Sequence, residues 1–565
     1  MIYVQMFQYY PERGNDLLYW QKALRWGWIC IFCLAVLVAL PARSLAHAYI
    51  VAATPAANEQ LMEAPKTIRI EFNENIQSTF YALTLVNQTG HEILLHDVRI
   101  DATNPHVLEG NVPNRLANGT YVVKWKVVSS DGHPVEGTIP FQIGQSSDNG
   151  ALSDSERNGY VPKFDMIIIR GLFYIGLSLF LSLLWFKLFI YLPLGTWRFS
   201  TRDRVLYWAA YSLTVLATLL SLPLQITVEA DVSWLQALEG ALVKKMLLHT
   251  DFGAIWIIQC VLLLLLFAVG YAATFGKKEH HLKRWAIVSF VLGTSILFAK
   301  AWTGHAAASS HPLVARVMDF LHLFSASVWV GCLVVIAAIL PFGIPGTAKS
   351  KYWEAVRRFS RWAIGLVAIL MMTGIYAALQ QVPTFDALFQ TIYGKVLLGK
   401  VLLLVVMLMF AAVNWISERK QKSVLGATVW SEFGLGIGAM LLAAMLTNLP
   451  PAAASPGPFT QTKEAGSYQV TLHITPNVLG TNQFQIKIKN AKGRAVQDIE
   501  QVKVTLTPKD IDMGETTFQA FKVASSIYQA KGTISMAGRW NVHVHILTTS
   551  LQSVDATFAC YVGSQ

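Results

Sequence analysis

The sequence predicts a mixed, multidomain membrane protein made of an exported β-sandwich, an eight-helix transmembrane bundle and a C-terminal exported β-sandwich. Apolar runs of roughly 18 or more residues, long enough to cross a bilayer, recur between residues 166 and 449. Shorter runs in which apolar and polar residues alternate, typical of half-buried strands, lie on both sides of that region. Only 14% of the 565 residues are charged, against about 25% in soluble domains. This composition excludes a purely soluble enzyme and a disordered scaffold.

Residues 1–46 have the features of a secretory signal peptide with a long leading region. Lys22 and Arg25 precede an apolar stretch, and small residues follow where a signal peptidase cleaves. Cleavage after Ala46 makes His47 the first residue of the mature chain. The alternative is an uncleaved membrane anchor in which His47 is an ordinary surface histidine.

Residues 47–145 are predicted to form the first β-sandwich. Apolar residues alternate in the runs 68–72 and 123–127, and turns that contain asparagine and glycine separate such runs. A period of two with regular turns is typical of strands that bury one face. Ten acidic and six basic residues give this domain a negative net charge, unlike the basic connections between the apolar runs.

The loop 130–134 of this domain carries Asp131 and His133, on either side of a glycine. Alone, this pair indicates no more than a polar loop. A free amino terminus at His47 adds an amine and an imidazole that chelate one metal ion together, and His133 supplies a third nitrogen. Three nitrogens and the Asp131 carboxylate suit Cu(II) best among common divalent ions, and Zn(II) is the alternative.

The same region carries four short motifs in order: His47-Ala48, Thr54-Pro55, Ser-Asp-Gly-His-Pro-Val-x-Gly at 130–137, and Phe-x-Ile-Gly at 141–144. Together they resemble the CopC copper-binding family. The resemblance implies a cupredoxin-like β-barrel with a Cu(II) site formed by His47, Asp131 and His133. Met62 is the only methionine between 47 and 145, so the second, Cu(I) site of methionine-rich CopC proteins is not expected. The remaining histidines of the domain are expected at the surface: His91, His96 and His106.

A polar linker, 146–163, leads to a predicted membrane domain, 164–449. Its eight spans are expected at about 166–192, 205–226, 254–275, 285–303, 313–341, 361–380, 394–416 and 434–449. The connections on one side of the membrane carry fifteen lysine and arginine residues, and those on the other side carry five. Because basic connections stay in the cytoplasm, we expect a multi-pass plasma-membrane protein with both terminal domains on the extracytoplasmic side. The net charge of +11 therefore reflects topology, and no nucleic-acid partner is predicted.

Ionisable residues gather around the start of the fifth span. Pro312 suits the first turn of a helix, which puts His322 about 15 Å along that helix, near the middle of the bilayer. Asp319 lies one turn earlier on the same side and is placed to orient the ring of His322. With His305 and His311 at the outer mouth, these residues form a candidate copper path, since ionisable groups at such depth usually face a pathway or a partner. The alternative is that Asp319 and His322 satisfy each other as a buried pair.

The motifs Gly304-His305-Ala306, His322 with Ser327-x-Trp329-x-Gly331, and Tyr393-Gly394-Lys395 followed by Lys400 resemble the CopD membrane family, which occurs beside CopC or fused behind it. Cys332 stands where CopD relatives often have glycine, and we expect it to affect packing, with Cu(I) binding as the alternative. Methionine fills gaps in apolar cores and also suits Cu(I). We expect packing roles for the six methionines of the last three spans: Met371, Met372, Met407, Met409, Met440 and Met445.

A proline- and alanine-rich linker, 450–466, precedes the last domain, 467–565. Four runs, at 468–475, 483–489, 502–507 and 540–547, are expected to be strands of a second sandwich. The motifs Met513-Gly514, Tyr528, Met536-x-Gly538-x-Trp540 and His543-x-His545 resemble the YtkA-like domain family. His543 and His545 share one sheet face and, with Met513 or Met536, form a candidate accessory copper site. The alternative is a surface pair without a ligand.

These observations predict copper acquisition at a bacterial cell envelope, in which the exported domain captures Cu(II) and the membrane domain conducts copper inward. A soft membrane path suits Cu(I), so an external copper chaperone or a reductase is an expected partner, beside copper ions and the lipid bilayer. The sequence contains no reductase motif and no P-loop, and the protein is predicted not to be an enzyme. The alternatives are a copper resistance or sequestration protein, a haem-containing membrane redox protein and a copper sensor.

Overall fold

A computed structural model describes most of the chain from residue 48 onward. The described residues are 48, 50–56, 59–113, 116–129, 134–144, 164–191, 199–276, 279–302, 312–343, 349–420, 425–449, 451–453, 456–478, 480–491, 493–496, 498–509, 515–534 and 538–563. The predicted signal peptide and most of the polar linker lie outside these ranges.

The N-terminal domain packs two sheets over one core, as its alternating sequence predicts. One sheet has the order β1-β3-β7-β6 and the other the order β2-β9-β8-β4-β5. The strands are β1 (Ile50–Thr54), β2 (Gln60–Leu61), β3 (Thr67–Phe72), β4 (Ala82–Asn87), β5 (Glu92–Ile93), β6 (His96–Ile100), β7 (Val107–Asn111), β8 (Gly119–Val128) and β9 (Pro134–Ile143). Trp125 of β8 meets Phe72 of β3 edge to face, with ring centroids 5.3 Å apart. Gly137 of β9 lies directly under Trp125, where a Cβ atom would approach the indole to 2.7 Å.

Among the residues that the structure describes, eight helices are long and apolar enough to cross a membrane, as predicted. They span Phe164–Tyr191, Thr201–Ala230, Asp251–Phe275, His281–Ala301, Leu313–Ile339, Ser350–Gln381, Ile392–Arg419 and Ala427–Leu446. In order, they are built from α2 (Phe164–Trp185), α3 (Thr201–Ala230), α5 (Asp251–Phe275), α6 (Glu279–Ala301), α7 (Pro312–Val334), α9 (Lys349–Gln381), α11 (Ile392–Lys420) and α12 (Ala427–Leu446). The C-terminal ends of α2 and α7 continue as π-helical turns, at Phe186–Tyr191 and Val335–Ile339.

Helix starts follow local sequence signals. Ser200 caps α3 in a reciprocal capping box with Asp203, and Thr250 accepts a hydrogen bond from Gly253 N at the start of α5. Such caps satisfy backbone N–H groups that have no partner inside the helix. The helix α7 begins at Pro312, where the sequence predicts it. Two short helices were not predicted: α4 (Gly240–His249) and α10 (Phe385–Gln390).

The helices α2 and α7 form the centre of the bundle. Their apolar spans are 67% and 61% buried by protein, whereas that of α11 is 6% buried. Gly331 of α7 permits the contact between them, because a Cβ atom there would lie 2.5 Å from the carbonyl oxygen of Ser178 and would collide with the Ser182 hydroxyl. The Trp-x-Gly motif therefore has a packing role in this fold.

The C-terminal domain folds over a single apolar core, in one eight-stranded sheet of order β10-β11-β12-β15-β14-β13-β16-β17. The strands are β10 (Phe459–Ala465), β11 (Tyr468–Thr475), β12 (Gly480–Asn490), β13 (Ile499–Pro508), β14 (Thr516–Ala524), β15 (Ile527–Ile534), β16 (Gly538–Thr548) and β17 (Ser553–Val562). The sheet curls until its edge strands meet, and Nζ of Lys463 on β10 donates to the carbonyl oxygen of Thr557 on β17, 2.6 Å away. The result is a barrel-like domain.

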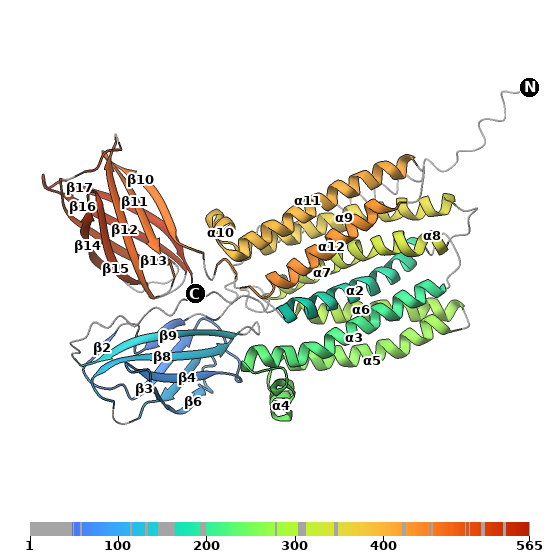
Figure 1. Ribbon diagram of the computed structural model, residues 1–565, viewed down its shortest axis with the longest axis horizontal. Helices are drawn as coiled ribbons and strands as arrows, with labels where there is room; N and C mark the ends of the chain where they lie inside the picture. The colour runs from blue at the N-terminus through green and yellow to red at the C-terminus, as the bar shows by residue number, and fades with distance from the viewer. Residues whose placement is uncertain are drawn as a thin grey trace, which may run out of the picture.

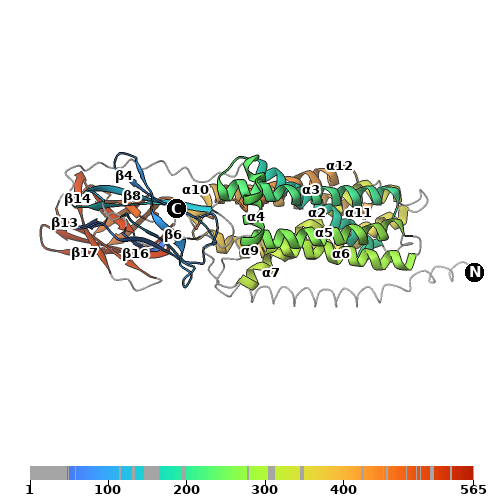
Figure 2. The ribbon, with the colours of Figure 1, turned by 90° about the horizontal axis from the view of Figure 1, so that it is seen from below.

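Both β domains lie at the same end of the helix bundle (Figure 1), and the perpendicular view agrees (Figure 2). The N-terminal domain contacts the helices through Phe80, whose ring lies 4.6 Å from Nζ of Lys245 on α4. Phe80 also packs against the apolar cluster formed by α3 and α4, which includes Ile226 and Met246. The segment that precedes the C-terminal domain also contacts the helices, since Ala453 N donates to the carbonyl oxygen of Gln381 on α9 at 3.0 Å.

Candidate copper sites

The three residues of the first predicted site, His47, Asp131 and His133, lie outside the described residues. Their described neighbours do meet. The amide of Ala48 donates to the Ser129 hydroxyl at 3.3 Å, although the two residues are 81 apart in sequence. The same hydroxyl donates to the carboxylate of Glu74. Ala48, which follows His47, is thus hydrogen-bonded to Ser129, which is two residues before Asp131.

This end of the N-terminal domain faces the helices. Lys126, near the end of β8, is close enough to Glu229 at the end of α3 for charge attraction between them. Phe80, which contacts α4, lies on the same side of the domain. The flank of the loop 130–134 is therefore close to the membrane domain.

The second predicted site is a polar cluster among α7, α9 and α11. The Nδ1 atom of His322 lies 2.9 Å from the hydroxyl oxygen of Thr373, and Nε2 lies 3.4 Å from Nζ of Lys400. The Thr373 hydroxyl itself donates to the carbonyl oxygen of Ile369 at 2.7 Å, so its oxygen accepts from Nδ1–H. The Lys400 ammonium has only donors, so the arrangement fits a neutral ring that faces Lys400 with the lone pair of Nε2.

Asp319 takes a different position from the one expected. Nδ1 of His322 contacts Thr373 and Nε2 faces Lys400, so the carboxylate of Asp319 does not orient the ring. Asp319 is instead close enough to Lys400 for charge attraction between them, and it lies near three buried tyrosines: Tyr174, Tyr376 and Tyr393. Asp319 and His322 thus share Lys400 as a neighbour, as expected for residues three apart on one helix face, but both ring nitrogens already have other partners. The two remaining path candidates, His305 and His311, lie outside the described residues.

The sulfur atoms of the bundle have packing environments. Cys332 is buried, and its thiol points at the carbonyl oxygen of Ser182 on α2 at 3.7 Å. Met407 and Met440 are buried in the bundle core, whereas Met371 and Met409 are 45% and 61% exposed on the outside of the bundle. No contact of either exposed methionine with the described residues of the cluster around His322 is seen.

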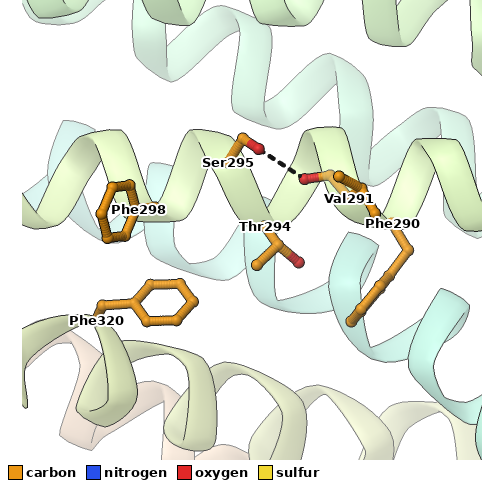
Figure 3. A pocket seen from close by; sticks show the side chains of 6 residues that line it. All are labelled: Phe290, Val291, Thr294, Ser295, Phe298 and Phe320. Atoms are coloured by element: carbon orange, nitrogen blue, oxygen red, sulfur yellow. Dashed lines mark hydrogen bonds between the residues drawn. The ribbon is translucent and has the colours of Figure 1, made fainter. Parts of the chain in front are cut away.

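A cavity of about 270 Å³ lies between α6 and α7 (Figure 3). It is lined by Phe290, Val291, Thr294, Ser295, Phe298 and Phe320. The Ser295 hydroxyl donates to the carbonyl oxygen of Val291 within the same helix, at 3.0 Å. No imidazole, carboxylate or thiol is among the lining residues, so this cavity does not suit a metal ion.

In the C-terminal domain the structure places His543 and His545 on one face, as predicted, and adds Asp555 between them. Sequence reasoning missed Asp555, because its proximity depends on the register of a hairpin. The register pairs His545 with Asp555, and Asp555 lies on β17 (Ser553–Val562), a strand that was not predicted from the sequence. The proposed methionine partners, Met513 and Met536, lie outside the described residues.

Four family models match the chain in sequence order. They are the CopC domain at 50–144, the copper resistance protein D-like N-terminal domain at 163–313, copper resistance protein D at 353–446, and the YtkA-like domain at 462–545. The copper transport protein CutJ of Bacillus subtilis is 33% identical over 543 residues, which cover 95% of this chain and 99% of that protein. The chain belongs to the CopC–CopD copper transport and resistance family.

Other family members match single parts of the chain. Copper resistance protein D of Pseudomonas syringae is 30% identical over 186 residues, 32% of this chain and 58% of that protein. Among solved structures, CopC from Methylosinus trichosporium OB3b is 30% identical, covers 18% of this chain and 98% of its own, and has a TM-score of 0.16. The family and its eight apolar helices identify a multi-pass membrane protein.

Proposed function

We propose that this protein acquires copper at the bacterial cell envelope. Its N-terminal domain captures Cu(II) on the extracytoplasmic side and passes copper to the helix bundle, which conducts it inward. The single observation that carries the proposal is the match to a copper transport protein over 95% of this chain. Copper is the cargo, and both β domains at one end of the bundle (Figure 1) suit capture outside followed by transfer.

The proposed capture site consists of His47, Asp131 and His133. Its support is the hydrogen bond between Ala48 N and the Ser129 hydroxyl, which joins the segments that carry these residues. An amino-terminal histidine offers an amine and an imidazole, so signal cleavage after Ala46 is part of the proposal. His133→Ala should abolish tight Cu(II) binding by the mature protein, measured by titration with Cu²⁺; unchanged affinity would remove His133 as a ligand. His106→Ala is the matched control, because His106 Nδ1 contacts the carbonyl oxygen of Phe72 at 3.2 Å.

The proposed membrane path runs past Asp319 and His322, with His305 and His311 at its outer mouth. The cluster around His322 supports it, since buried ionisable groups inside a membrane are costly and usually functional. The imidazole is neutral, which is the form that binds a metal ion. Because Lys400 lies at Nε2, copper reaches this nitrogen only when the ammonium moves aside. Copper in this path is Cu(I) in the proposal, so reduction by an external partner precedes entry.

The direction of transport separates acquisition from resistance, the second candidate. Relatives that match single domains are named copper resistance proteins, and they favour that alternative. Cells that lack the protein should contain less copper than wild-type cells at limiting external copper, and overexpressing cells should contain more. Higher cellular copper in the deletion strain would reverse the assignment.

A haem protein is a weaker alternative, because an axial histidine needs a ring nitrogen directed at the iron, and both nitrogens of His322 have protein neighbours. The visible spectrum of the purified protein tests this point, since a Soret band would establish haem. An enzymatic role is also outside the proposal, in line with the relatives' names as copper transport and resistance proteins.

A further inference from the structure

Two histidines and one carboxylate meet on the outer face of the C-terminal sheet. His543 and His545 are two apart on β16, so their side chains leave the same face. Asp555 on β17 is the register partner of His545. Nε2 of His543 lies 3.0 Å and Nδ1 of His545 lies 2.7 Å from one atom, Oδ1 of Asp555. The three possible ligand atoms all lie within 4.8 Å of one another.

These separations suit a shared metal ion. Two ligands held at right angles, each about 2.1 Å from an ion, lie about 3.0 Å apart. The two contacts with Asp555 already have this length. An ion can therefore replace the bridging protons with only small side-chain movements.

The surrounding structure fixes the ligands in place. The ladder between β16 and β17 is continuous from Gly538 and Val562 to Leu547 and Ser553, so the three Cα atoms are held by backbone hydrogen bonds. The hydroxyl of Thr557 lies 3.0 Å from Nδ1 of His543, which directs Nε2 toward Asp555. Outer contacts of this kind orient metal-binding histidines in known sites.

Charge and access also favour a cation. The hydrogen bond from His545 holds the pKa of the Asp555 carboxyl below its ordinary value, so this group is ionised at neutral pH. The side chains of His543, His545 and Asp555 are 40%, 35% and 48% exposed, which leaves the site open to ions in solution. Cys560 on the same strand does not compete for the metal ion, because burial raises the pKa of its thiol to about 12 and keeps the thiol protonated.

We propose that His543, His545 and Asp555 bind a divalent transition-metal ion, and that Cu²⁺ is the ion held most tightly. Two imidazoles and a carboxylate are nitrogen and oxygen ligands, which favour divalent ions over the softer Cu⁺, and affinity among divalent ions peaks at copper. This second site has its own ligands and does not depend on the N-terminal site or on the direction of transport.

The test is a Cu²⁺ titration of the full-length protein in detergent. The pair variant His543→Ala/His545→Ala should bind one equivalent less than wild type. Asp555→Asn should weaken the same equivalent by more than about tenfold, since even outer partners of metal ligands are worth about 10- to 100-fold in affinity. The matched control is His473→Ala, because His473 on β11 contacts Thr460 much as His543 contacts Thr557. It should bind as many equivalents as wild type.

An unchanged stoichiometry in the pair variant would overturn the proposal. A measurement on the unaltered protein guards against misfolding of the variants. Cu²⁺ should protect His543 and His545 from acylation by diethyl pyrocarbonate, with His473 reacting equally with and without the ion. Equal reaction of all three histidines would also overturn it. Loss of an equivalent in His133→Ala alone reports on the proposed capture site, so the two proposals fail independently.

Discussion

The ring of His322 is held from two sides by residues of other helices. Thr373 on α9 accepts from Nδ1, and Lys400 on α11 faces Nε2. In the proposed path, an incoming copper ion and the Lys400 ammonium compete for the lone pair of Nε2. The attraction between Lys400 and Asp319 offers the ammonium another partner. Under this proposal, Lys400 closes the path to cations until it moves toward the Asp319 carboxylate.

Substitutions at His322 and Thr373 should separate ligand from positioning residue. His322→Ala should abolish inward copper flux through the bundle, because it removes the imidazole. Thr373→Val should lower flux by about 10-fold or more, the usual effect of losing an outer partner of a metal ligand. The measurement is uptake of ⁶⁴Cu by cells that express each variant, with expression matched by immunoblot.

His249→Ala is the control, because His249 lies exposed at the end of α4 and away from the cluster. It should transport like wild type. His322→Ala and Thr373→Val should both keep Cu(II) binding by the N-terminal domain, since the two positions are inside the bundle. Wild-type uptake by His322→Ala would reduce this residue to a packing role.

The position of His322 along its helix could be predicted from sequence, and its contacts could not. The start of α7 at Pro312 and a fixed rise per residue place His322 about 15 Å along the helix. Thr373 is 51 residues away and Lys400 is 78, so their proximity depends on how three helices pack. Asp555 was missed for a similar reason, because a strand register places it beside His545.

At the scale of whole elements, long periodic segments were predicted best. The eight spans agree with the helices, although α9 begins at Lys349, twelve residues before the expected apolar segment. Its first turns are polar, and hydropathy reports only the membrane-embedded part. The short helices α4 and α10 were missed because ten and six residues carry too little periodic signal. The strand β11 at Tyr468–Thr475 matches the prediction.

The contact between α2 and α7 depends on Gly331. Gly331→Ala should destabilise the bundle by about 1–3 kcal/mol, the usual cost of overpacking, because the added methyl group meets Ser178 and Ser182. A lower midpoint of thermal unfolding in detergent, followed by tryptophan fluorescence, would report this effect.

Gly365→Ala on α9 provides the matched control. A Cβ atom at Gly365 meets nothing within 4 Å, and alanine is favoured over glycine inside a helix by roughly 0.5–1 kcal/mol. The midpoint should therefore stay the same or rise. Equal destabilisation by both substitutions would show that loss of glycine itself, rather than the contact between α2 and α7, causes the effect.

At the scale of the whole molecule, the position of the N-terminal domain would link the proposed capture of copper to its proposed transport. Its described contacts with the helices join Phe80 to Lys245 and Lys126 to Glu229. In the sequence, Lys126 of the second pair precedes Asp131, one of the proposed Cu(II) ligands, by five residues. Short separation between a capture site and the bundle would allow copper to pass without release into bulk solution.

This docking can be weakened without touching a ligand. Phe80→Ala removes a cation–π contact worth about 0.5–1 kcal/mol and its packing on α3 and α4, so ⁶⁴Cu uptake at limiting copper should fall by about 2- to 5-fold. Cu(II) affinity should not change. Lys245→Ala should act in the same way, and the double variant should add little, since both changes break one contact.

Met62→Ala is the control, because Met62 is 89% exposed on the same domain. A loss of uptake in Met62→Ala as large as in Phe80→Ala would contradict the docking role.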